Sequence, residues 1–187
     1  MKNIIVSILF SVLFYSSLIA HVGHYNKFSY LEYKLFRNNK PIGYHKYEFD
    51  RKDDILTIKS LVEFKISKLN IDLYKYYAKS TEIYKKSQFY SFSSETNQNK
   101  KEKYVKITVD TDKKILNIDG SSYKGPANIE NIVGTWWNHE IIKSKSQISA
   151  ISGRIIEQSV TFVGKEKLNM NGKEYNALRF NFKSSDE

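Results

Sequence analysis

The residues with the most distinctive chemistry lie in one short run, Thr135-Trp136-Trp137-Asn138. If the run is extended, its two indole side chains point to opposite faces, so one packs in the core and the other lines the mouth of a ligand site. In the alternative, both tryptophans pack and Asn138 caps a short helix that follows. Trp136, Trp137 and Asn138 are therefore candidate ligand-binding residues.

A second candidate surface is built from tyrosine, of which the chain holds 14. Tyr74 and Tyr76, with other tyrosines near them in the predicted sheet, could line a groove for an amphipathic ligand. Cross-strand aromatic pairing on a half-exposed sheet is the alternative. We add Tyr74 and Tyr76 to the predicted ligand-binding residues.

Histidine offers a further chemistry near the amino terminus. Cleavage after Ala20 would place His21 first, where its α-amine and imidazole could chelate copper, with His24, His45 or His139 as a further ligand. A histidine close to a chain end is more commonly a mobile polar residue. The sequence therefore predicts no metal site and no cofactor.

Acidic residues gather in predicted turns, at Asp53-Asp54, Asp110-Thr111-Asp112 and Asp119. Paired carboxylates can act as acid and base, but turn formation is the ordinary role of aspartate in such positions. The pair Asp110 and Asp112 also lacks the glycine and closing glutamate of a calcium loop. We find no nucleophile-elbow, P-loop or zinc-protease motif. The sequence predicts no catalytic residue and favours a non-enzymatic protein, with an active site assembled from distant residues as the open alternative.

Composition narrows the classes of partner. The formal net charge is +10, and the positive residues are overwhelmingly lysines scattered along the chain. Scattered lysines without recurring arginine forks indicate a solvated surface, so no nucleic-acid partner is predicted. The chain has no cysteine, which excludes disulfides and thiolate metal sites.

The first 20 residues have the form of a signal peptide. A positive start at Lys2 precedes the uncharged run 4–20, and Ala20 is a small residue before a polar stretch. An uncleaved anchor is the alternative, since the run approaches the length that spans a bilayer. We predict a signal peptide over 1–20, a mature domain over 21–187 without a stable membrane span, and a periplasmic or secreted location.

After residue 23 the hydrophobic pattern has a period of two. Alternating runs near 31–35, 43–50, 56–66, 71–84, 89–95, 105–109, 115–118, 155–162 and 178–182 predict antiparallel strands. Asn171-Gly172 is the strongest hairpin signal, and 138–145 predicts a short helical segment. The predicted fold is all-β, an up-and-down, strongly curved sheet or half-barrel, because a broad sheet must cover its apolar face.

These features lead to a functional prediction. A curved sheet with an apolar wall headed by Val62, Phe64, Val105 and Ile107 would bind an apolar or amphipathic molecule such as a lipid. The alternative is a structural or interaction module that recruits another cell-envelope protein through an open sheet edge.

Several short motifs together carry a family resemblance. They are Asn39-Lys40-Pro41-Ile42-Gly43, Leu73-Tyr74-Lys75-Tyr76, Thr135-Trp136-Trp137-Asn138, Gly153-Arg154-Ile155 and Asn171-Gly172-Lys173. Over roughly residues 28–183 the chain resembles a family of exported bacterial β proteins classed as a domain of unknown function. More loosely, it is similar to the curved-sheet folds of periplasmic lipoprotein carriers, which implies an architecture rather than an activity.

The sequence departs from that family at its end. The family pattern continues beyond the Gly172 hairpin with further strands that carry a Trp-Tyr pair, whereas this chain ends at Glu187. We therefore expect a fragment or a shortened member, with an exposed edge strand or an incompletely closed groove.

Overall fold

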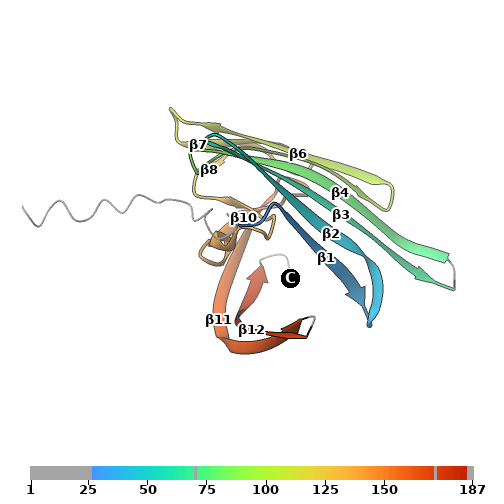
Figure 1. Cartoon of the computed structure of the whole chain (residues 1–187). Helices are drawn as coiled ribbons and strands as arrows, with labels where there is room; N and C mark the ends of the chain where they lie inside the picture. The colour runs from blue at the N-terminus through green and yellow to red at the C-terminus, as the bar shows by residue number, and fades with distance from the viewer. Residues whose placement is uncertain (1–26, 70, 171, 185–187) are drawn as a thin grey trace, which may run out of the picture.

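The computed structural model describes residues 27–69, 71–170 and 172–184 (Figure 1). The predicted signal peptide lies outside the described residues, as do His21 and His24, the candidate copper ligands that are not predicted to form a metal site. Within the described ranges, no helix is long and apolar enough to cross a membrane.

Strands dominate the described chain, and one short helix interrupts them. The elements are β1 (Tyr30–Arg37), β2 (Lys40–Lys52), β3 (Ile55–Lys68), β4 (Ile71–Lys85), β5 (Gln88–Gln98), β6 (Lys101–Asp110), β7 (Ile115–Gly120), β8 (Lys124–Asn128), β9 (Ile132–Val133), the 3₁₀ helix η2 (His139–Ile142), β10 (Ser146–Ile148), β11 (Ile155–Met170) and β12 (Lys173–Ser184). The all-β prediction is confirmed, and the predicted helical segment is a single four-residue turn.

Strands β1 to β8 form one sheet in chain order, each antiparallel to the next. Tight turns set this order. The β1–β2 connection has Asn38 and Asn39 at φ 49° and 60°, which is the left-handed pair that a two-residue hairpin turn requires. The up-and-down order expected from the sequence is therefore confirmed.

The prediction of a strongly curved sheet or half-barrel is wrong. β1 and β8 remain the two edges of an open sheet, which is broad and twisted rather than strongly curled (Figure 1). The physical reason is that another segment of the same chain, which we call the cover, packs on the apolar face of the sheet. Residues 133–152 lie across one face, so the sheet buries much of its apolar surface without closing.

The two short strands at this cover, β9 and β10, belong to a second sheet, in the order β12-β11-β10-β9. β9 and β10 are parallel and very short, whereas β11 and β12 form a long antiparallel hairpin that projects from the rest of the molecule (Figure 1). Gly172, at φ 75°, lies in its turn and confirms the hairpin predicted there. Beyond Ser159 most side chains of the hairpin are exposed.

The core lies on the face of the large sheet toward residues 133–152, which we call the inner face. Over β5, β6 and β7 a buried group packs against Val133 and Ile148 of the cover, and we call it the covered half. Its members are Phe92, Val105, Ile107, Leu116 and Ile118. Gly120 and Gly153 hold the cover close, because a Cβ on Gly120 would lie 2.5 Å from the Ser152 carbonyl oxygen. Gly153, of the Gly153-Arg154-Ile155 motif, has φ 80°, a backbone conformation that favours glycine at this position.

Candidate functional site

A buried carboxylate joins the large sheet to the tryptophan loop. Glu82 of β4 is 3% exposed and accepts hydrogen bonds from Tyr84 Oη at 2.6 Å, Trp137 Nε1 at 2.7 Å and Thr135 Oγ1 at 3.1 Å. Asn138 Nδ2 donates to Tyr84 Oη at 3.4 Å. We call these five residues the Glu82 cluster. Tyr84 donates to one carboxylate oxygen and Trp137 and Thr135 donate to the other, so both oxygens are hydrogen-bonded, which makes burial tolerable.

Aromatic packing fixes the same loop. Trp137 is 3% exposed and meets Phe49 and Tyr84 edge-on, with ring centroids 5.8 and 5.7 Å apart. Tyr47 Oη donates to the Thr135 carbonyl oxygen at 2.6 Å. The loop is therefore held by core packing and by buried hydrogen bonds together.

The electrostatics of the Glu82 cluster follow from its burial. Removal from water raises the pKa of Glu82, while the hydrogen bonds from Tyr84, Trp137 and Thr135 act in the opposite direction. Burial also raises the pKa of Tyr84 well above its ordinary value, and the adjacent Glu82 adds to that shift. Both oxygens of the buried carboxylate therefore have donors from the protein itself.

Trp136 differs from its neighbour. It is 58% exposed, adopts φ 65°, and contacts Phe182 of β12 with ring centroids 5.3 Å apart. The left-handed backbone at Trp136 turns its side chain out of the core while Trp137 turns in. One tryptophan is thus buried and the other exposed, which is one of the two arrangements considered from the sequence, and they lie in a bend rather than on a strand.

Asn138 serves the chain itself. Its side chain accepts from the Glu140 backbone N–H at 3.1 Å and caps η2. This is the alternative predicted for Asn138. With its amide nitrogen on Tyr84, both ends of the side chain are engaged.

Part of the inner face extends beyond the cover. Register places its residues in line with the covered core, on β2, β3 and β4, and we call this group the open half. Its members are His45, Val62, Phe64, Ile66, Tyr74 and Tyr76, all half-buried. Phe64 stacks on Tyr76 and Tyr74, with centroids 4.9 and 5.9 Å apart. The two tyrosines predicted from the sequence therefore form one aromatic surface.

His45 lies where the open half meets the core. Its ring is 4.2 Å from that of Tyr47, and its Nε2 is 2.9 Å from Ser60 Oγ. Burial lowers the pKa of His45 to about 4, so the imidazole is neutral at pH 7. A neutral ring keeps this boundary free of charge.

The opposite face of the sheet has a different character. There, ionic side chains pair across strands, as Lys46 does with Glu32 and Lys79 does with Glu95. Tyr44 also donates to Glu63 on this face, at 2.8 Å. Such pairs indicate a surface adapted to water.

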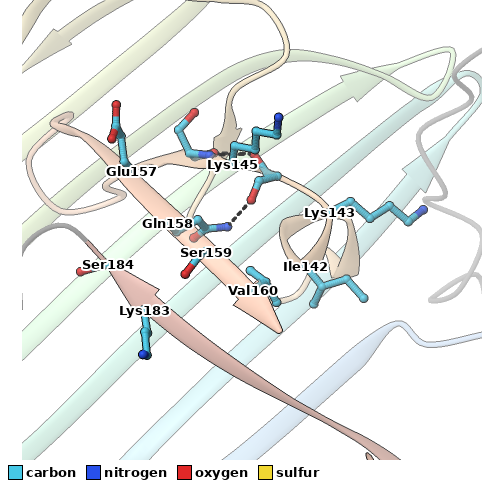
Figure 2. A pocket seen from close by; sticks show the side chains of 11 residues that line it. Ile142, Lys143, Lys145, Glu157, Gln158, Ser159, Val160, Lys183 and Ser184 are labelled. Carbon is cyan, nitrogen blue, oxygen red and sulfur yellow. Dashed lines mark hydrogen bonds between the residues drawn. The ribbon is translucent and has the colours of Figure 1, made fainter. Parts of the chain in front are cut away.

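An open groove of about 850 Å³ lies between the end of η2 and the hairpin (Figure 2). Most of the residues that line it are polar or charged in type. The residues are Ile142, Lys143, Ser144, Lys145, Ser146, Glu157, Gln158, Ser159, Val160, Lys183 and Ser184. The expected apolar wall is not built as predicted, because Val105 and Ile107 are buried beneath the cover while Val62 and Phe64 belong to the open half.

The acidic turn residues have ordinary structural partners. Asp110 accepts the Lys113 backbone N–H at 3.0 Å, and Asp119 pairs with Lys124 at 2.9 Å. Within the part of the chain that the structure describes, no group of three histidine, aspartate or glutamate side chains is placed to hold a metal ion.

Comparison with known proteins gives one result. Residues 33–187 match the model of a family described as a domain of unknown function, DUF6134. The chain belongs to the DUF6134 family. No curated protein and no solved structure matches it significantly. The predicted membership of a family of unknown function is confirmed.

The structure of this DUF6134 domain divides the predicted site residues into separate groups. Trp137 and Asn138 belong to the buried Glu82 cluster, Trp136 stands on the hairpin side, and Tyr74 and Tyr76 form the open half. A ligand-binding role for them stays a prediction. Trp136, Tyr74 and Tyr76 are the ones with accessible surface.

Sequence reasoning missed Glu82, the residue that ties the tryptophan loop to the sheet. A signal for it exists. Glu82 has the same parity along β4 as Tyr84, Ala78 and Tyr76, so it is the one charged residue in that row between Tyr74 and Tyr84. A charged residue in the core-facing row of a strand predicts a buried hydrogen-bond network.

Proposed function

We propose that this DUF6134 domain binds an amphipathic molecule, such as a lipid, through the open half of its inner face. The observation that supports this most directly is the row of half-buried aromatic and aliphatic side chains that continues the core past its cover. Exposed apolar surface of this kind is uncommon on a protein that needs no partner.

The residue types favour an amphipathic ligand over a purely apolar one. Tyr74 and Tyr76 present a ring that packs against hydrocarbon and a hydroxyl that can face water or a polar headgroup. The net charge of +10 further favours a ligand with an anionic headgroup.

Trp136 extends the proposed surface. It stands next to Trp137, which is fixed in the core, and contacts Phe182 on the hairpin. Phe182 is opposite Val160 in the hairpin register, and Phe180 is opposite Phe162. The hairpin thus carries a second apolar row that could close over a ligand held on the open half.

The proposal includes a setting outside the cytoplasm, periplasmic or secreted, with residues 1–20 as the export signal. It does not include catalysis, because the buried carboxylate is engaged by protein donors. Asp110 and Asp119 of the acidic turns are likewise engaged, in a local hydrogen bond and an ion pair.

Adjacent tyrosines on β4 give a matched test. Tyr76 lies on the inner face, and Tyr77 lies on the outer face opposite Glu63. We expect Tyr76→Ala to weaken binding of a fluorescent fatty acid, cis-parinaric acid, by about tenfold, since a buried aromatic contact contributes about 1–2 kcal/mol. Tyr77→Ala should leave the affinity unchanged. Equal loss in both variants, at equal folded fraction, would contradict the proposal, as would the absence of saturable binding to the unaltered protein.

A further inference from the structure

β11 changes its neighbours at Gln158. Residues 155–157 pair with β10, and the Gln158 backbone N–H donates to the Lys145 carbonyl oxygen at 2.9 Å. From Gln158 onward β11 pairs with β12, which lies along its other edge. The edge that β10 occupied is left without a strand neighbour among the described residues.

The parity of the ladder tells which backbone groups lie on that edge. In an antiparallel strand, successive residues direct their N–H and C=O groups to alternate sides. Because Gln158 directs its N–H away from β12, Val160 and Phe162 also present their backbone groups at the open edge. An edge of this kind is a template for an additional strand.

The open groove runs along this edge. Its lining comes from three segments: Lys143 and Lys145 after η2, Glu157 to Val160 of β11, and Lys183 and Ser184 of β12 (Figure 2). The Gln158 side chain fixes the segment after η2, because its Nε2 donates to the carbonyl oxygens of Ile141 at 2.9 Å and Ser144 at 3.0 Å. The groove beside β11 is therefore preformed and would not have to open to admit an added strand.

The charged residues of the groove indicate which kind of added strand it would bind. Lys143, Lys145 and Lys183 line the groove, against Glu157 as the acidic member of the lining. Lys143 also pairs with Glu140 at 2.9 Å, so Lys145 and Lys183 carry more of the attraction. A second copy of this lysine-rich hairpin would be repelled, whereas an acidic strand would be attracted.

We propose that an extended, acidic segment of a partner protein adds to the free edge of β11 as a β-strand and fills this groove. The main-chain hydrogen bonds of Val160 and Phe162 would supply affinity, and the lysines would supply selectivity. This interaction goes beyond the proposed ligand binding, because it uses the backbone edge of β11 whereas the ligand proposal rests on side chains of β2, β3 and β4, and the two are tested by different variants and probes.

The test uses a labelled peptide of alternating valine and glutamate, with fluorescence anisotropy as the readout. Val160→Pro removes the edge N–H and spares the β12 ladder, because that N–H points away from β12. We expect at least about fivefold weaker binding, corresponding to one lost hydrogen bond. Val160→Thr, which keeps the N–H, should bind as the unaltered protein does.

Charge provides a second, separate readout. Lys145→Glu with Lys183→Glu should abolish the preference for the glutamate peptide over a valine–lysine peptide, and it keeps the proposal testable if proline at 160 impairs folding. No saturable binding of the glutamate peptide would overturn the proposal. Full binding by folded Val160→Pro, or an unchanged peptide preference after charge reversal, would overturn it too.

Discussion

The covered half and the open half of the inner face form one continuous surface, but the first is buried under the cover and the second is only half-buried. The covered half is largely aliphatic, with Phe92 as its buried aromatic member, and Val133 and Ile148 pack over it. The open half is built around Phe64, Tyr74 and Tyr76 and is left half-buried. The two groups differ in where hydroxyls lie: Tyr74 and Tyr76 of the open half carry hydroxyls that water or a polar headgroup can contact. Buried tyrosines on this face, Tyr47 and Tyr84, instead donate their hydroxyls to protein acceptors.

The largest expected effect separates the two halves by stability, using the same substitution in each. Ile107→Ala in the covered half should lower the free energy of unfolding by about 2–5 kcal/mol, because it leaves a cavity in a fully buried site. Ile66→Ala in the open half should cost less than about 1 kcal/mol, since its surroundings are already open to solvent. Urea unfolding measures both. Equal losses would show that the open half is as much a core as the covered half.

The next effect concerns the Glu82 cluster, which fastens the cover to the sheet. Glu82→Ala should destabilise the protein by about 2–4 kcal/mol, since Trp137 Nε1 and Thr135 Oγ1 lose their acceptor while buried. Glu82→Gln keeps one acceptor oxygen and should cost clearly less. Urea unfolding curves of the two variants measure this difference. Equal stability of the alanine and glutamine variants would contradict the role of the Glu82 hydrogen bonds in holding the cover to the sheet.

The smallest effect lies at the boundary between the halves and depends on pH. His45 has a folded pKa of about 4 against an ordinary 6.5. Between these values the unfolded chain binds a proton that the folded protein does not, so stability falls as pH is lowered from 6.5 toward 4. Allowing for partial exposure of the ring, the loss is about 1 kcal/mol.

The matched control for that effect is His45→Asn, which should lack this part of the pH dependence. The raised pKa of Glu82 acts with the opposite sign, because its protonation favours the folded state. Subtracting the variant's curve from that of the unaltered protein therefore isolates His45. Superimposable curves over this pH range would mean that the ring is freely solvated.

Much of the fold follows from local patterns in the sequence. Alternation in 56–66 and 105–109 predicts strands that the structure contains, and Asn171-Gly172 predicts the β11–β12 hairpin. These signals are local, because the two-residue period and the turn residues depend only on neighbouring side chains.

The rest depends on contacts between distant segments. Whether the sheet closes depends on what covers it, and the cover is formed by β9, η2 and β10, whose short segments have no clear periodicity. For the same reason, the opposite fates of Trp136 and Trp137 could be expected in outline, but Glu82 as the partner of Trp137 could not be. They are 55 residues apart in sequence.

Native mass spectrometry of the full-length protein recovered from the periplasm of an expressing cell tests the central claim most directly. The account predicts a chain that lacks residues 1–20 and carries an extractable lipid, with the lipid lost in Tyr76→Ala and kept in Tyr77→Ala. A bare chain, or a lipid retained equally by both folded variants, would contradict the assignment of the open half as the ligand surface.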